Sequence, residues 1–226
     1  MLKIESLGFQ WPTVSTPIIN GLNLTINSGE WVALIGDNGA GKSTLLRLIA
    51  GLLKPGSGHV FLQNKNIASM KAAQRAPLVG VLFQEAERQI FHNRVRDEIA
   101  FGLRHQGIRG DELQQKIMQT LALCELTDVA DAHPLDLHAG QRRMVAVASL
   151  AAVAPPLLLL DEPSRDFDSQ WLAIFTKWLS VCREQGTTIL AISHDYDFVK
   201  QHFSRTIRLA NGVIVEDRET HSMHIS

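Results

Sequence analysis

A glycine-rich segment near the N-terminus has the residue types that bind the phosphates of a nucleotide. The segment reads Gly36-Asp37-Asn38-Gly39-Ala40-Gly41-Lys42-Ser43-Thr44, between an apolar run and an amphipathic stretch. Its glycines allow several backbone N–H groups to point at one anion, and a helix that starts here adds partial positive charge. Lys42 is expected to reach the β- and γ-phosphates, and Ser43 to bind Mg²⁺. The alternative is a glycine-rich structural turn, but the full match in this context favours nucleotide binding.

Two carboxylates follow a run of four leucines, residues 157–160. The run has the pattern of a buried strand, and Asp161 and Glu162 come directly after it. Ligand sites in open α/β sheets lie at the carboxyl ends of strands. Asp161 is therefore predicted to support Mg²⁺, directly or through water, and Glu162 to polarise an attacking water as a general base. In isolation such a pair would more often end a strand and cap a helix, but beside a phosphate-binding loop the catalytic interpretation is favoured.

The elements that must position these residues alternate along the chain. Apolar periodicity predicts strands at about 2–10, 18–26, 31–35, 59–62, 78–83, 157–161, 188–192, 206–209 and 213–216. It predicts helices at about 42–53, 97–105, 111–124, 140–154 and 169–185. The dipeptide Asn211-Gly212 is a strong hairpin signal. The order predicts an α/β fold with a mostly parallel core sheet, an N-terminal antiparallel β portion and an inserted helical subdomain.

Composition narrows the functional class. The chain has 226 residues and a net charge of -1, without the basic excess of a nucleic-acid binder. Cys124 and Cys182 are far apart and have no metal-site spacing, so we expect two reduced thiols in a cytosolic protein. We expect no signal peptide, because the N-terminus has no basic region followed by an apolar stretch. We also expect no membrane span, because Pro155-Pro156 divides the most apolar stretch into a helix and a strand. Membrane association would then come only through partners.

Further motifs, in order, make nearly the whole chain resemble the ATP-binding-cassette (ABC) ATPases. Gln84 follows an apolar strand and resembles the Q-loop glutamine, which in the family contacts Mg²⁺ and water and links to the membrane partner. The segment Leu137-His138-Ala139-Gly140-Gln141 is similar to the family signature Leu-Ser-Gly-Gly-Gln. Asp168 resembles the D-loop aspartate, His194 the switch histidine that senses the γ-phosphate, and Trp11 the aromatic that stacks on adenine. Each motif is weak alone, but their order around a phosphate loop gives them weight.

The resemblance implies a P-loop NTPase of the ABC type, a single ATPase domain over residues 1–226. Its RecA-like core would comprise about 1–84 and 157–226, and its helical subdomain about 85–156. Two cassettes would pair head to tail, identical or different, and sandwich ATP between the phosphate loop of one and the signature helix of the other. Glu162, His194 and Gln84 would then serve hydrolysis. Arg142 and Arg143, on the signature helix, are expected to cover surface rather than to pair with acids.

The signature departs from the family, with His138 in place of serine and Ala139 in place of the first glycine. Three alternatives stay open: His138 donates to phosphate, it turns away and leaves the backbone amides to act, or the site is weak and depends on a partner cassette. If His138 donates as an imidazolium, ATPase activity should rise below about pH 6.5 relative to a His138→Ser variant. Arg165 and Phe167 in the D-loop also depart from the family, and the sequence offers no account of them.

Two stretches further resemble the ATPases of energy-coupling-factor transporters, which import vitamins and transition-metal ions into prokaryotic cells. They are Gln89-Ile90-Phe91 and residues 97–103. The resemblance implies that residues 84–95 receive transmembrane subunits and that the protein is peripheral, at the cytoplasmic face of the inner membrane. The alternatives are a regulatory or assembly subunit with weak hydrolysis and a non-transport ABC ATPase. His221 and His224 are expected to be inert rather than metal-binding.

Overall fold

The computed structural model describes residues 1–220 of the chain. The histidines at 221 and 224 therefore lie outside the described residues. The described chain forms two compact units. The first contains Met1–Val81, Pro156–Pro163 and the residues from Gly186 on, and the second contains Leu82–Pro155 and Ser164–Gln185. None of the helices in residues 1–220 has the length and hydrophobicity that a bilayer-spanning segment requires.

A four-stranded sheet begins the first unit. Its strands, in the order β2-β1-β4-β5, are β1 (Leu2–Phe9), β2 (Ile19–Ile26), β4 (Ser57–Leu62) and β5 (Lys65–Asn66). Neighbouring strands in this sheet are antiparallel. On β2 the apolar residues Leu22, Leu24 and Ile26 are buried while their neighbours are exposed, which is the two-residue period of a half-buried strand. The predicted antiparallel N-terminal portion is therefore present.

The second sheet has six strands in the order β10-β9-β3-β8-β7-β6. They are β3 (Trp31–Ile35), β6 (Val79–Leu82), β7 (Leu157–Asp161), β8 (Thr188–Ile192), β9 (Arg205–Ala210) and β10 (Val213–Glu219). Every residue of β3, β7 and β8 is buried, as expected for strands covered on both faces. The pairs β3–β8, β3–β9 and β7–β8 are parallel, so their carboxyl ends meet at one edge.

The predicted hairpin joins β9 to β10. Asn211 and Gly212 both have positive φ, 49° and 75°, as a two-residue hairpin turn requires. This turn packs against the other sheet: the N–H of Asn20 on β2 donates to the carbonyl of Gly212 at 3.0 Å. A Cβ on Gly212 would lie 2.5 Å from the carbonyl oxygen of Ile18. Gly212 is therefore enclosed by backbone, while Asn211 is exposed to solvent.

The α-helices in the described part of the first unit are α1 (Lys42–Ile49), α2 (Ala72–Arg75) and α7 (Tyr196–His202). The first, α1, ends at Ile49 rather than at residue 53, because Gly51 takes a left-handed φ of 70° and its N–H reaches the carbonyl of Leu48 at 3.0 Å. The short helix α7 was not predicted. Its N-cap is Asp195, whose carboxylate accepts from the N–H of Phe198 at 3.0 Å.

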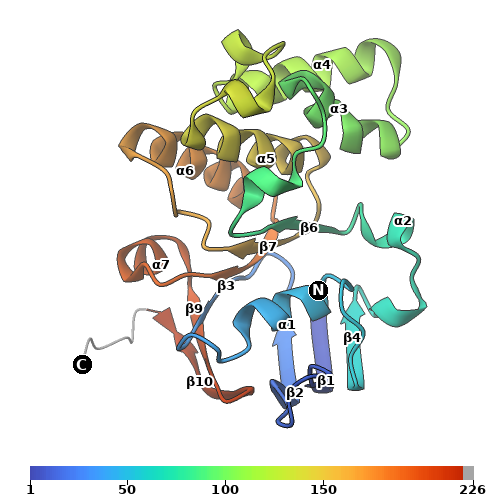
Figure 1. Cartoon of the computed structure of the whole chain (residues 1–226), viewed down its shortest axis with the longest axis vertical. Helices are drawn as coiled ribbons and strands as arrows, with labels where there is room; N and C mark the ends of the chain where they lie inside the picture. The colour runs from blue at the N-terminus through green and yellow to red at the C-terminus, as the bar shows by residue number, and fades with distance from the viewer. Residues whose placement is uncertain (221–226) are drawn as a thin grey trace. The chain divides into compact units, whose positions relative to one another are not determined.

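The second unit is helical and centres on α5 (Ala139–Val153), which packs against the other three main helices. These are α3 (Val95–His105), α4 (Gly110–Leu123) and α6 (Ser169–Glu184). Figure 1 shows α5 and α6 side by side in this unit. The expected division placed residues 164–185 in the core, but the structure groups them with the helices. The reason is that α6 buries Trp171, Phe175 and Trp178 within the helical unit.

Candidate nucleotide site

The predicted phosphate loop connects β3 to α1 in the first unit. At Gly36 (φ 142°) a Cβ would run into the carbonyl oxygen of Leu209 on β9. At Gly41 (φ 102°) a Cβ would lie 2.7 Å from the carbonyl oxygen of Ile18. Only glycine fits both positions, because the backbone conformation and the close approach of other backbone exclude a side chain. The loop is thus held at both ends by backbone contacts.

Lys42 begins α1 and lies on the inner side of the loop. It is buried, and its Nζ donates to the carbonyls of Gly36 at 2.6 Å and Asp37 at 2.9 Å. Burial lowers the pKa of the Lys42 ammonium, while Glu162, Asp161 and Asp37 act in the opposite direction. The ammonium therefore lies in the field of the two carboxylates at the carboxyl end of β7. Ser43 is exposed on the first turn of α1, and Thr44 is buried.

Asp161 and Glu162 lie where the sequence predicts, at the carboxyl end of β7. Asp161 is buried and pairs in register with Ile192 of β8. The N–H of Glu162 donates to the carbonyl of Ile192 at 2.9 Å, and Glu162 has a φ of 50°. Burial raises the pKa of the Glu162 carboxyl, although the backbone N–H and the ring of His194 and the Lys42 ammonium partly offset it. A base with a raised pKa is better matched to proton transfer near neutral pH.

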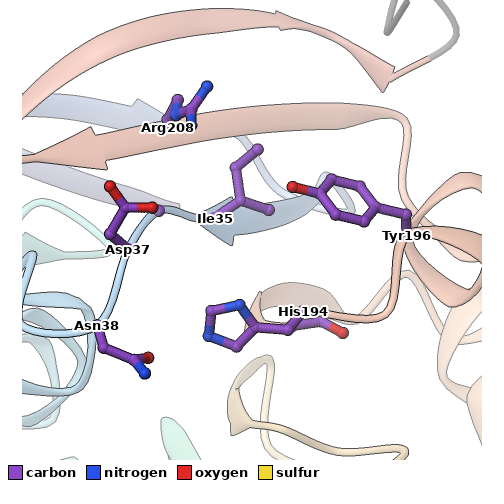
Figure 2. Close-up of a pocket in the computed structure, with 8 residues that line it drawn as sticks. Ile35, Asp37, Asn38, His194, Tyr196 and Arg208 are labelled. Atoms are coloured by element: carbon purple, nitrogen blue, oxygen red, sulfur yellow. The ribbon is translucent and has the colours of Figure 1, made fainter. Parts of the chain in front are cut away.

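His194 follows β8, so it emerges beside the end of β7. Its Nε2 lies 3.5 Å from Oε1 of Glu162, and its backbone N–H donates to Oε2 at 3.4 Å. The His194 side chain is 53% exposed and that of Glu162 is 16% exposed. Figure 2 shows the His194 ring projecting toward Asn38 of the phosphate loop. The structure thus brings the predicted base and the predicted switch histidine together.

A pocket of about 230 Å³ lies beside this pair in the first unit. Its lining is Ile35, Gly36, Asp37, Asn38, Ser193, His194, Tyr196 and Arg208 (Figure 2). Tyr196 and Arg208 were not predicted as site residues. Tyr196 belongs to α7, which the sequence did not predict, and Arg208 has the pattern of an exposed strand residue. Trp11 lies outside this pocket, with its ring edge-on to Phe9 at a centroid distance of 4.9 Å.

The remaining predicted site residues belong to the helical unit. Gln84 follows β6, and its side chain is exposed. Asp168 is the N-cap of α6: its Oδ1 accepts from the N–H of Trp171 at 3.0 Å. The expectation that Arg143 covers surface is wrong, because the side chain is only 2% exposed and Nη1 donates to the carbonyl of Gln84 at 2.8 Å. The neighbouring Arg142 is partly buried and donates to the carbonyl of Leu137 at 2.7 Å.

His138 caps the start of α5. Its Nδ1 accepts from the N–H of Gln141 at 3.5 Å, and its ring meets Trp171 edge-on at a centroid distance of 5.7 Å. Gly140 is buried, and a Cβ there would lie 2.6 Å from the indole of Trp171. Trp171, which no sequence pattern singles out, therefore shapes this end of the helix.

Comparisons with known proteins show which family the chain resembles. The family described as ABC transporter matches residues 19–165. A Methanosarcina mazei protein named as an ABC transporter ATP-binding protein is 37% identical over 216 residues, or 96% of this chain. The chain spans 36% of that protein's length, and 40% or less of several other relatives.

Two solved structures share the fold. The ATP-binding cassette MJ0796, in a dimeric post-hydrolysis state bound to ADP and Pi, superposes with a TM-score of 0.89 at 25% identity, covering 99% of this chain and 100% of that one. The cbiO1 protein from Clostridium perfringens, part of the ABC transporter complex cbiONQ, superposes with a TM-score of 0.85 at 28% identity. That match covers 97% of this chain and 88% of that one. The predicted α/β cassette fold is confirmed.

Proposed function

The chain belongs to the ABC transporter family of ATP-binding proteins, and from this premise we propose that it hydrolyses ATP to energise a membrane importer. The observation that carries the proposal is the contact of Glu162 with His194 at the ends of two adjacent parallel strands, β7 and β8. The third strand of this group, β3, leads into the phosphate loop. Base, histidine and loop thus share one edge of the sheet, where ligands of open α/β sheets bind.

The residues present fit a magnesium nucleotide. The phosphate loop contains Gly36 and Gly41, where close backbone contacts exclude any side chain. Lys42 supplies a buried cation at the inner side of this loop. The exposed hydroxyl of Ser43 and the carboxylate of Asp161 are oxygen ligands of the kind that Mg²⁺ prefers, and we assign the Gln84 amide to the same role. When bound, Mg²⁺ neutralises charge that develops on the phosphates.

In this proposal Glu162 orients the attacking water and accepts its proton, since burial raises the pKa of its carboxyl. The His194 ring holds the carboxylate in place and faces the phosphate loop, where it can support the γ-phosphate. Trp11 would stack on adenine. The distal side of ATP would be completed by a second cassette through His138, Gly140, Gln141 and Asp168, and the dimeric state of MJ0796 supports such pairing. Identical and different partner cassettes both fit.

We assign the importer to the energy-coupling-factor type, with a vitamin or a transition-metal ion as cargo. The similarity to cbiO1, part of a transporter complex, supports this assignment. Within residues 84–95, Phe91 is 80% exposed, which suits a surface that receives a transmembrane subunit. The altered signature at His138 favours a second candidate, a regulatory or assembly subunit that hydrolyses ATP weakly.

The first test is steady-state ATP hydrolysis by the purified chain over a range of protein concentrations. We expect activity to rise more than linearly with concentration, to require Mg²⁺ and to vanish in Glu162→Gln, while Glu5→Gln, an exposed carboxylate on β1, serves as the matched control. An ATPase rate that is the same in Glu162→Gln as in the unsubstituted chain would refute the role of Glu162 as the general base. Intact ATP binding without turnover, even with a second cassette and the membrane subunits, would favour the regulatory candidate.

The partner is tested separately. We expect Phe91→Ser to abolish co-purification with the transmembrane subunit while the ATPase activity of the isolated chain stays unchanged. Unimpaired co-purification of the variant would remove residues 84–95 from the docking surface.

A further inference from the structure

Arg143 is a buried cation that contacts two loop segments of the helical unit. It lies in the second turn of α5 and is 2% exposed. Its Nη1 donates to the carbonyl of Gln84 at 2.8 Å, across 59 positions of sequence. On another side, its guanidinium carbon lies 5.7 Å from the ring centroid of Phe167. One side chain therefore joins the segment after β6, the signature helix and the segment before α6.

Phe167 is itself anchored. Its ring lies 5.4 Å from that of Phe175, which is fully buried and in turn lies 5.5 Å from Trp178 on the same helix. The aromatic face of Phe167 thus forms a fixed platform, and a guanidinium is attracted to such a face. This arrangement accounts for an aromatic residue in the D-loop, which the sequence left unexplained.

Gln84 is held at its backbone and exposed at its side chain. The loss of a hydrogen bond from a buried donor costs free energy, so the bond from Nη1 of Arg143 restrains the Gln84 carbonyl. Restraint of the Gln84 backbone restricts the directions in which its side-chain amide can project. The hydrogen bond from Nη1 goes to the backbone carbonyl and not to this amide.

We propose that Arg143, supported by Phe167, is a positioning residue that aims the Gln84 side chain for ATP hydrolysis. The proposal rests on the proposed function, because Gln84 must take part in hydrolysis for its aim to matter. It also makes the D-loop platform and the Q-loop parts of one rigid piece within the helical unit. A substitution of Phe167 is therefore expected to alter the orientation of the Gln84 side chain, because the Arg143 guanidinium contacts both residues.

The test is a double-mutant cycle measured in single-turnover ATP hydrolysis with protein in excess. Gln84→Ala keeps the carbonyl that Arg143 binds and removes the amide that it aims. We expect Arg143→Met to lower the hydrolysis rate about 10-fold in the otherwise unchanged protein, and less than about 2-fold in the Gln84→Ala background. We expect the ATP concentration at half-maximal rate to change less than about 2-fold in both, because the phosphate loop is untouched.

Equal losses in the two backgrounds would show that Arg143 only stabilises the unit and would overturn the proposal. Arg104→Met, an exposed arginine on α3, is the matched control and should leave the rate unchanged. If Arg143→Met unfolds, Arg143→Lys and Phe167→Ala decide, since both keep a cation at position 143. Each should lower the rate about 3-fold, and only when Gln84 is present.

Failure of the proposed function gives a different result. In that case the unsubstituted chain either does not hydrolyse ATP or does so with no response to Glu162→Gln. A chain that responds to Glu162→Gln and shows no coupling between Arg143 and Gln84 overturns only the positioning role.

Discussion

The carboxylate of Glu162 and the imidazole of His194 meet with Oε1 and Nε2 3.5 Å apart, although 32 positions separate the two residues in the sequence. The contact follows from topology. Each residue comes after the carboxyl end of a parallel strand, and the two strands are neighbours in register, with Asp161 opposite Ile192. The pair has consequences for stability and for pH dependence.

Glu162→Gln should stabilise the protein at neutral pH. Burial raises the pKa of the Glu162 carboxyl above its unfolded value, so its contribution to stability is full below the unfolded pKa and is lost as pH rises through the folded pKa. Glutamine has no ionisable proton, so the variant does not lose stability as the pH rises. Denaturant unfolding at pH 7 should therefore give a higher midpoint for the variant, and the gap should close toward about pH 4. A variant that is less stable than the parent at pH 7 would contradict this account.

His194→Ala should move the acid limb of the rate profile to higher pH. The His194 ring lowers the pKa of the Glu162 carboxyl, and its backbone N–H, which does the same, remains in the variant. Without the ring the carboxyl binds its proton more tightly, so the base is lost at a higher pH. The measurement is kcat against pH for the variant, the parent and His59→Ala, an exposed histidine on β4. Superimposable acid limbs would rule out the electrostatic contact.

Gly140→Ala should destabilise the helical unit. The added Cβ would lie 2.6 Å from the indole of Trp171, and overpacking of this kind costs about 1–3 kcal/mol. Denaturant unfolding should show the loss, and Trp171→Leu in the same chain should restore part of it by making room. Ala139→Gly changes the neighbouring exposed residue and should cost only about 1 kcal/mol of helix propensity. Without rescue by the leucine, the indole would not be the cause.

The two thiols should be inert in the folded protein. Burial raises the pKa of Cys124 to about 12 and that of Cys182 to about 12, and neither is in a disulfide. The thiolate is the reactive form, so alkylation by iodoacetamide at pH 8 should be very slow until denaturant is added. Rapid modification of the folded chain, read by mass spectrometry, would mean that the helical unit opens readily.

The parts of the fold that the sequence predicted best are those with a local signal. The strands Trp31–Ile35, Leu157–Asp161 and Thr188–Ile192 have their predicted bounds, because a strand buried on both faces is a continuous apolar run. The helix Tyr196–His202 was missed, since it is too short to show a helical period. It carries Tyr196, so part of the pocket lining was missed with it.

The site shows the same division between local and distant causes. The loop containing Lys42 and the pair Asp161 and Glu162 were predicted from short motifs, and the structure places them at one sheet edge. The burial of Arg143 was not predicted. It depends on a carbonyl 59 positions away and on a ring in another loop, which no pattern around residue 143 encodes. The chemical roles of all these residues stay predictions, as do those of Ser43, His194, Trp11, Gln84, His138 and Asp168.

The hairpin turn at Gly212 bears on how the protein can be labelled. Surface turns are ordinarily the safest places to insert a tag or a fluorophore. Gly212 of this turn is enclosed by the backbone of Ile18 and Asn20, and the carbonyl of Ile18 also lies against Gly41 of the phosphate loop. An insertion there would push directly on the loop. Between α3 and α4, by contrast, a Cβ added to Gly107 would meet no atom within 4 Å, so this turn of the helical unit is the better place for a reporter.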